Sequence, residues 1–315
     1  MTEQSPAIHI RELTKTFRIG LRRKRTEALR GLDLDVQPGE IFGFLGPNGA
    51  GKTTTIKILV GLLKSDRGQA RIFGKSVRDA ASRARLAYMP ELPDFYDYLK
   101  PSEFLLHMGN LAGLDRATSR RRIPELLERV GLDPDEKRPM RKFSKGMLQR
   151  VGLAQTMIGD PDLYILDEPM GGLDPMGRRA VKDLIHELGR RGKTVFFSSH
   201  VLAEAEAVCH RVAFMRDGKL IRQGELSELL TDKLSPFEIL LEGPAAQKDQ
   251  VLAEKCQSVS PAGKDSLLHL AEGQRPEDLL GWLKDKGYRL HGINRRQTSL
   301  EDVFIRTMQD EAEGN

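Results

Sequence analysis

The stretch Gly46-Pro-Asn-Gly-Ala-Gly-Lys-Thr53 decides the fold, because it matches the phosphate-loop pattern G-x-x-x-x-G-K-[ST] in full. The apolar run Ile41–Leu45 precedes it as a buried-strand candidate, and Thr53–Leu63 follows with the pattern of a helix. Glycines let backbone N–H groups turn toward phosphate oxygens, and the helix N-terminus adds partial positive charge. An ordinary glycine turn is the alternative, which the flanking strand and helix disfavour. We expect Lys52 to contact the β- and γ-phosphates and the Thr53 hydroxyl to bind Mg²⁺.

A second, acidic site follows later in the chain. Leu163–Leu166 is typical of a buried strand, and it ends directly in Asp167 and Glu168. The carboxyl ends of parallel strands face the ligand, so Asp167 is placed to hold Mg²⁺. Glu168 is placed to orient or deprotonate an attacking water. A surface turn is the alternative for an isolated Asp-Glu pair, but the phosphate loop in the same domain favours the catalytic interpretation.

The order of the expected elements indicates an α/β domain. Alternating strands and helices favour a parallel sheet, and Arg216-Asp-Gly218 predicts a tight turn between antiparallel strands. Residues 93–160 instead indicate a helical insert, with apolar positions at helical spacing after Ser144. The patterns predict strands at Leu32–Val36, 69–73 and Thr194–Phe197, and helices at Ser102–Gly109, Ile123–Val130, from about Ser144, and at Arg178–Leu188.

A change of pattern near Ser235-Pro236 predicts a second domain. The segments after it follow the order β-α-β-β-α-β-α, which predicts a small α+β domain, ferredoxin-like in type. We therefore expect domains at 1–230 and 236–315.

The composition of the chain excludes several classes of protein. The 315 residues are 39% apolar, a globular value, and the net charge of +5 is too mild to demand a nucleic-acid partner. The most apolar run, Ile58–Leu63, is far shorter than the roughly 18 residues that a membrane helix needs. The N-terminus lacks a secretory pattern. Two cysteines, Cys209 and Cys256, cannot build a disulfide scaffold. We expect an intracellular protein without a span of its own.

The motifs, taken in order, resemble the nucleotide-binding subunit of ATP-binding cassette (ABC) transporters over about residues 8–225. The resemblance implies a phosphate-loop NTPase cassette with a mixed sheet and an N-terminal antiparallel part. Ser144 precedes a helix, so its hydroxyl and nearby N–H groups can form an anion site. The stretches that carry the resemblance are Phe17, the Walker A loop Gly46–Thr54, the signature loop Phe143-Ser-Lys-Gly-Met147, the Walker B strand Leu163–Glu168, the D-loop Gly172–Pro175 and the switch dipeptide Ser199-His200.

The resemblance implies a role for each site residue. Glu168, His200 and Lys52 would be catalytic, and Thr53, Asp167 and Glu91 would hold Mg²⁺. ATP would contact Phe17, Gly46, Pro47, Asn48, Gly49, Ala50, Gly51, Lys52, Thr53, Thr54, Ser144 and Gly146. Core packing is the alternative for Phe17, a plain helix cap for Ser144, and a structural hydrogen bond for His200.

Two departures from the family pattern bear on these roles. Lys145 and Met147 replace commoner residues of the signature loop, but Ser144 and Gly146 remain, so the anion site should survive. Glu91 stands where the family usually has Gln. A glutamate can still bind a hard cation, but without metal it repels phosphate.

The surroundings of the core leave alternatives open. Leu92–Leu99, with its aromatic residues, fits either core packing or contact with a membrane subunit. The basic run Leu21–Arg25 fits a solvated loop or a contact with anionic lipid. The chain ending around Thr298–Phe304 resembles that of ATPases of the ABC-2-type exporter group.

The resemblance implies an ATPase subunit that closes as a head-to-tail dimer around ATP and drives a separate transmembrane permease. An exporter is favoured, and the protein would lie at the cytoplasmic side of the membrane, bound through that permease. The alternative is a soluble ABC-type ATPase that acts on nucleic acid or ribosomes. This alternative is weaker because the chain has one cassette, no long heptad run and a small net charge. A regulatory module without turnover is disfavoured by the presence of both Asp167 and Glu168.

Overall fold

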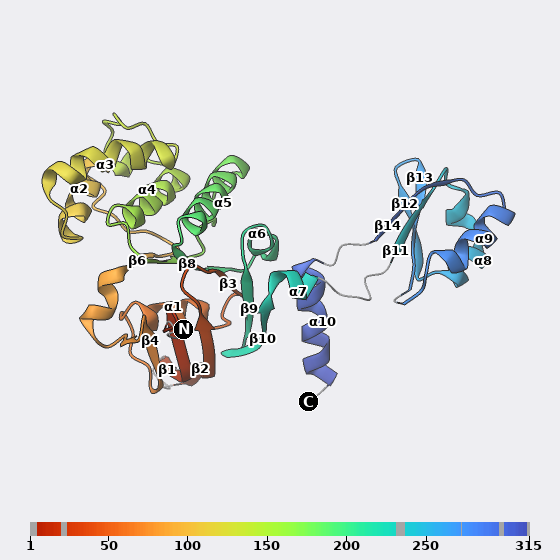
Figure 1. Ribbon diagram of the computed structural model, residues 1–315, viewed down its shortest axis with the longest axis horizontal. Helices are drawn as coiled ribbons and strands as arrows, with labels where there is room; N and C mark the ends of the chain where they lie inside the picture. Colours follow the sequence, from red (N-terminus) through yellow and green to blue (C-terminus); the bar gives the residue numbers. More distant parts are fainter. Residues whose placement is uncertain (1–4, 20–23, 231–236, 272, 296–298, 314–315) are drawn as a thin grey trace. The chain divides into compact units, whose positions relative to one another are not determined.

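The computed structural model describes residues 5–19, 24–230, 237–271, 273–295 and 299–313. It divides the chain into two compact units, Met1–Leu226 and Ser227–Asn315 (Figure 1). The division falls slightly before residue 230, where the sequence predicted the first domain to end. The predicted linker at 231–235 and most of the basic run at 21–25 lie outside the described residues.

The first unit opens with an antiparallel sheet in the order β2-β1-β4-β5, which confirms the predicted N-terminal antiparallel part. The sequence did not indicate β1, and the reason is its irregular register. Ile8, Ile10 and Leu13 are all fully buried, but bulges after Ile10 and after Leu13 break the two-residue alternation. The strands are β1 (Ile8–Ile19), β2 (Lys24–Val36), β4 (Arg67–Ile72) and β5 (Lys75–Ser76).

A mixed sheet carries the phosphate loop, with strands in the order β10-β9-β3-β8-β7-β6. Every neighbouring pair is parallel except the hairpin β9–β10, which turns at Asp217-Gly218 as predicted. All residues of β3, β7 and β8 are buried, as expected for central strands of a covered sheet. The strands are β3 (Ile41–Leu45), β6 (Leu86–Met89), β7 (Leu163–Asp167), β8 (Thr194–Ser199), β9 (Arg211–Arg216) and β10 (Lys219–Glu225).

Local signals set the ends of the helices. The helix after the phosphate loop stops earlier than predicted, because the chain turns through Gly61 at a φ of +77°. The helix predicted at Arg178–Leu188 starts earlier in the structure, because Asp174 caps it by accepting a hydrogen bond from the Gly177 N–H at 2.9 Å. The helical elements of the core are α1 (Lys52–Leu59), the 3₁₀ turn η1 (Ala80–Arg85), α5 (Pro175–Arg190) and α6 (Leu202–Glu206).

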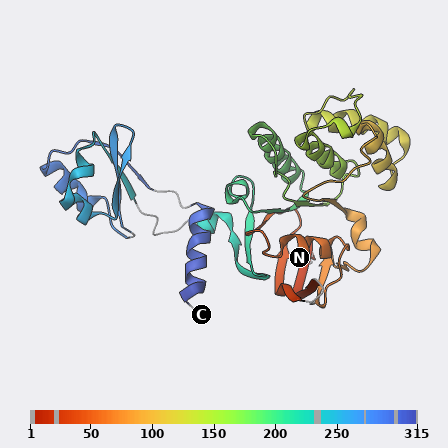
Figure 2. The same ribbon diagram turned by 180° about the vertical axis from the view of Figure 1, so that it is seen from behind.

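Three helices form the insert, and they lie together in both views of the ribbon (Figures 1 and 2). The middle helix begins well before the predicted Ile123, because Asp115 caps it by accepting from the Thr118 N–H at 2.8 Å. The elements are α2 (Pro101–Leu111), α3 (Arg116–Arg129), the 3₁₀ turn η2 (Met140–Lys142) and α4 (Lys145–Met157).

The second unit contains an antiparallel sheet in the order β12-β13-β11-β14. With helices after its first and third strands in the chain, this is the ferredoxin-like arrangement that the sequence predicted. The elements are α7 (Leu226–Leu230), β11 (Phe237–Leu241), η3 (Ala245–Lys248), α8 (Gln250–Lys255), β12 (Ser258–Ala262), β13 (Asp265–His269), α9 (Glu277–Asp285), β14 (Leu290–Arg295) and α10 (Leu300–Glu313). Across the described parts of both units, no helix has the length and apolar character of a membrane span.

Candidate functional site

The phosphate loop wraps one end of β3 and lines a cavity of about 140 Å³. The backbone geometry of the loop requires glycine at two of its positions. A Cβ on Gly46 would lie 2.3 Å from the Met215 carbonyl oxygen, and one on Gly51 would lie 2.6 Å from that of Ala28. Gly51, at a φ of +108°, directly precedes the first turn of α1. The lining comprises Ala28, Pro47, Asn48, Gly49, Ala50, Gly51, Lys52, Thr53, Thr54, Glu91 and Glu168.

Lys52 lies inside this loop with only 6% of its surface exposed. Its ammonium group donates to the carbonyl oxygens of Gly46 at 2.6 Å and Pro47 at 3.3 Å. The same Nζ atom lies 3.4 Å from Oε1 of Glu168. The lysine therefore joins the loop to the acidic end of β7.

Asp167 ends β7 and is 1% exposed. Ser198 on the neighbouring strand β8 donates to its Oδ1 at 2.6 Å, and Thr53 donates to the same atom at 3.3 Å. Burial raises the pKa of this carboxyl, and the charges of Glu168 and Glu91 add to the rise. Sequence reasoning missed Ser198. Two serines end the otherwise apolar strand β8. This pattern could have indicated a hydrogen-bonding role for Ser198, because a polar group in a buried strand needs a partner.

Glu168 has a backbone φ of +49°, which is uncommon for a residue other than glycine. Three contacts hold it in this conformation. Its N–H donates to the Ser198 hydroxyl at 3.0 Å, and its Oε2 lies 2.9 Å from Nδ1 of His200. The buried Gln149 amide donates to the carbonyl oxygens of Glu168 at 3.5 Å and Pro169 at 3.3 Å. Sequence reasoning assigned no role to Gln149, a polar residue on the otherwise apolar face of α4.

Four predicted nucleotide contacts do not line this cavity, namely Phe17, Gly46, Ser144 and Gly146. Phe17 is half-buried with the Lys15 ammonium 5.7 Å from its ring centre, and Ala28 lines the cavity instead. Ser144 and Gly146 lie at the start of α4, where the Ser144 hydroxyl accepts from the Met147 N–H at 3.3 Å. Their predicted roles stay predictions.

The aromatic stretch after Glu91 divides into two kinds of residue. Phe95 packs edge-on against Phe104 with ring centres 4.9 Å apart. Tyr96 and Tyr98 are 54% and 64% exposed, and their ring centres are 6.2 Å apart. Packing against α2 therefore explains Phe95 but leaves the two tyrosines available.

The donor set around Asp167 is suited to a hard cation. The Thr53 hydroxyl and the carboxylates of Asp167 and Glu91 supply only oxygen atoms, which Mg²⁺ prefers. The described residues contain no group of three or more His, Cys, Asp or Glu side chains that could hold a metal alone. Mg²⁺ usually binds one or two carboxylates and takes its other ligands from phosphates and water.

Comparisons with known proteins decide the family. The family model described as ABC transporter matches residues 29–171. An ABC transporter ATP-binding protein of Synechocystis sp. is 38% identical, over 98% of this chain and 86% of its own length. This chain belongs to the ABC transporter ATP-binding proteins.

Two further matches agree with that assignment. The Nod factor export ATP-binding protein I of Paraburkholderia xenovorans is 35% identical to this ABC protein, over 88% of this chain and 90% of its own. A solved ATP-binding cassette, dimeric in a post-hydrolysis state with ADP and Pi, has a TM-score of 0.64 at 23% identity. It covers 70% of this chain and 98% of its own. This last likeness concerns the fold alone. The predicted family and fold class are thus confirmed, and membership of this family supports the predicted ATP hydrolysis.

Proposed function

We propose that this ABC protein is the ATP-hydrolysing subunit of a transporter, that it drives a separate membrane permease, and that the direction is export. The observation that carries this proposal is the cluster at the ends of β3, β7 and β8. There Lys52, Glu168 and His200 form one chain of contacts beside Thr53 and Asp167. The names of relatives in export systems support the direction. They also favour a transporter over the alternative of action on nucleic acid or ribosomes.

The residues divide the work of phosphoryl transfer. The N–H groups of residues 47–53 cradle the phosphates, and Lys52 exchanges its carbonyl contacts for phosphate oxygens. Glu168 accepts the proton of the attacking water, and His200 holds its carboxylate in place through the 2.9 Å contact. Mg²⁺, when held by Asp167, Thr53 and Glu91, neutralises charge on the phosphates.

A second copy of the chain completes the site in this proposal. Ser144 and Gly146 begin α4 outside their own cavity, and Ser144 is exposed to solvent. The start of this helix offers free N–H groups to an anion. In a head-to-tail dimer, these residues of one copy would face the terminal phosphate of ATP bound by the other. The dimeric state of the solved cassette supports this arrangement.

The exposed pair Tyr96 and Tyr98 is the proposed contact with the permease. The pair follows Glu91 closely in the chain, so a displacement of the tyrosines can move Glu91, which lines the nucleotide cavity. Large exposed aromatic groups are typical of interaction surfaces. Through this contact, the protein would lie at the cytoplasmic side of the membrane.

The test is Glu168→Gln, which keeps the shape of the side chain and removes its basicity. We expect the ATPase rate to fall by about 10²–10⁴-fold and an ATP-bound dimer to accumulate on size-exclusion chromatography. Glu204→Gln is the matched control, because Glu204 is also buried but bonds to Ser199 at 2.8 Å and lies outside the cavity. A wild-type rate in the Glu168 variant would reject the assignment of the catalytic base.

A further inference from the structure

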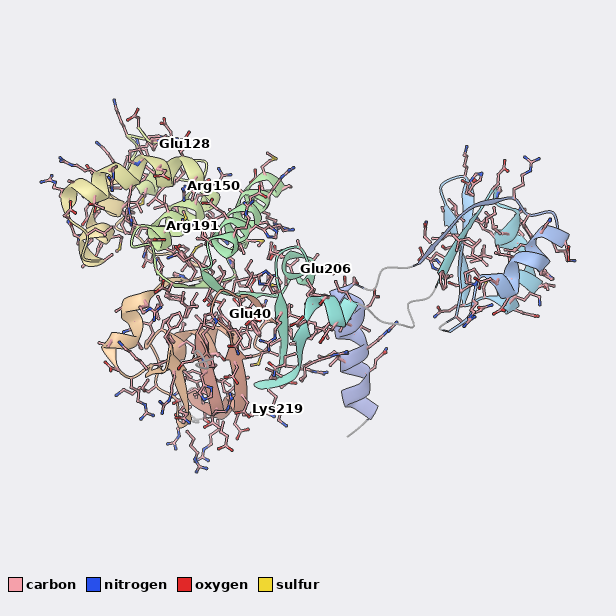
Figure 3. All side chains as sticks on the ribbon, in the orientation of Figure 1. Glu40, Glu128, Arg150, Arg191, Glu206 and Lys219 are labelled. Atoms are coloured by element: carbon pink, nitrogen blue, oxygen red, sulfur yellow. The ribbon has the colours of Figure 1, made fainter. Side chains whose placement is uncertain are left out.

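A cavity of about 210 Å³ lies where the helical insert meets the mixed sheet, away from the phosphate loop. It is bounded by α3, the end of α4, the start of β7 and the residue after α5. Figure 3 labels Arg191 at this place. Its polar lining consists of Arg122, Glu125, Arg129, Asp160, Tyr164 and Arg191.

Tyr164 is the unusual member of this lining. It is 1% exposed, yet it borders the cavity. Among the residues that the structure describes, none makes a hydrogen bond with its hydroxyl. Ser119 Oγ is the only described side-chain nitrogen or oxygen atom that is both fully enclosed and unpartnered, so the Tyr164 hydroxyl is accessible, and the residue borders this cavity. Burial raises the pKa of the phenol, so the group stays protonated and can donate to an acceptor.

The cations of the cavity are all arginines, and one of them lacks a carboxylate partner. Arg129 pairs with Glu125 at 2.7 Å and with Glu187 at 3.2 Å, and Arg191 pairs with Asp160 at 3.0 Å. Arg122 donates to the Ile158 carbonyl oxygen at 2.9 Å and forms no ion pair within the described part of the chain. Each guanidinium has five N–H groups, so Arg122 retains donors beyond this contact. Arg122 therefore supplies the lining with a positive charge that no carboxylate pairs, and with free donors.

We propose that this cavity binds a small phosphate anion, either inorganic phosphate or the phosphate group of a small metabolite. Arginine forks match the oxygens of phosphate in pairs, and the Tyr164 hydroxyl supplies a neutral donor from the floor of the site.

The position of the site gives the anion a structural effect. α4 ends here and begins at Ser144, and β7 begins here and ends at Asp167. An anion bound between α3, α4 and β7 holds the insert against the sheet at the ends of α4 and β7 that lie away from Ser144 and Asp167. Bound phosphate therefore stabilises the first unit and keeps the positions of Ser144 and Asp167 relative to each other constant.

The test uses the full chain with Lys52→Ala, which removes phosphate binding at the phosphate loop. Isothermal titration with inorganic phosphate, and separately with glycerol 3-phosphate, should show one site with a Kd below about 10 mM. Tyr164→Phe and Arg122→Gln should each weaken binding about tenfold, since each removes a hydrogen bond to a charged ligand. Arg121→Gln is the matched control, because Arg121 is exposed on the same helix and does not line the cavity.

Stability supplies a second measurement. Phosphate should raise the melting temperature of the Lys52→Ala protein more than that of its Tyr164→Phe derivative, because only bound ligand stabilises the fold. Tighter binding of glycerol 3-phosphate than of phosphate identifies a metabolite, and the reverse identifies the free ion. Absence of saturable binding, or equal affinity in the Tyr164, Arg122 and Arg121 variants, overturns the proposal.

Discussion

The hydroxyl of Ser198 is the most informative single group to remove, because it serves both acidic residues of the site. It donates to Asp167 Oδ1 at 2.6 Å and accepts from the Glu168 N–H at 3.0 Å, and the residue is fully buried. Ser198→Ala leaves the Glu168 N–H without its partner and leaves Asp167 Oδ1 with only the longer 3.3 Å hydrogen bond from Thr53. A hydrogen bond to a charged group is worth about 1.5–3 kcal/mol, so the free energy of unfolding should fall by about that amount. Removing a partner that orients a metal ligand typically lowers metal affinity by about 10–100-fold.

The assay is ATP hydrolysis against Mg²⁺ concentration, together with urea unfolding followed by circular dichroism. The half-saturating Mg²⁺ concentration should rise by about 10-fold or more in the Ser198 variant. Ser199→Ala is the matched control, because its buried hydroxyl donates to Glu204 at 2.8 Å instead. That control should lose stability to a similar degree and keep the normal Mg²⁺ dependence. If both variants show the same Mg²⁺ dependence, Ser198 does not position Asp167 and the reasoning is wrong.

Two further predictions concern the loop and the first sheet. Gly51→Ala should lower stability by about 1–3 kcal/mol and abolish ATP binding, because its Cβ would meet the Ala28 oxygen at a φ of +108°. Gly192→Ala, at +72° with open space, should lose only about 1 kcal/mol; equal losses in urea unfolding would argue against the clash. Asp35→Asn should cost about 1 kcal/mol at pH 7, because hydrogen bonds from Arg11 and His9 outweigh burial and lower the pKa of Asp35. This contribution is present above the usual value of 3.8 and is lost as pH falls through the lowered pKa. Stability of the wild type and the variant should therefore converge in acid.

The parts of the fold that the sequence predicted are those with a local cause. The phosphate loop, the hairpin at Asp217-Gly218 and the ferredoxin-like order all follow from short patterns. β1 was missed because its bulges move the buried side from Ile10 to Leu13, which breaks the alternation that marks a strand. The start of α3 was missed because its first two turns are polar, and only the Asp115 cap indicated the helix there.

Site residues that belong to a sequence motif could be predicted. Site residues that reach the site only through a tertiary contact could not. Lys52, Glu168 and His200 were expected together, and the structure places them in contact. Ser198 bonds to the Asp167 carboxylate and the Glu168 N–H, whereas Gln149 bonds to the backbone carbonyl oxygens of Glu168 and Pro169. These contacts depend on the register of β7 with β8 and on the packing of α4. Such pairings cannot be inferred from one chain without contact information, because a buried serine has many alternative partners.

The charge balance of the cavity links Glu91 to the need for a metal. Lys52, the one cationic side chain among the described residues that line the cavity, contacts Glu168, and Glu91 lines the same cavity. The charges of both glutamates also act on Asp167. ATP adds further negative charge, and Lys52 must leave its 3.4 Å contact with Glu168 to meet it. A Gln at position 91 would remove one of these repulsions, so we expect Glu91 to make nucleotide binding depend more strongly on a divalent cation. Burial and the charges of Glu168 and Glu91 raise the pKa of Asp167, which is the direction expected of clustered carboxylates. The same repulsion should weaken binding of ATP alone and favour joint binding of nucleotide and Mg²⁺, and we expect the carboxylate at position 91 to strengthen that coupling.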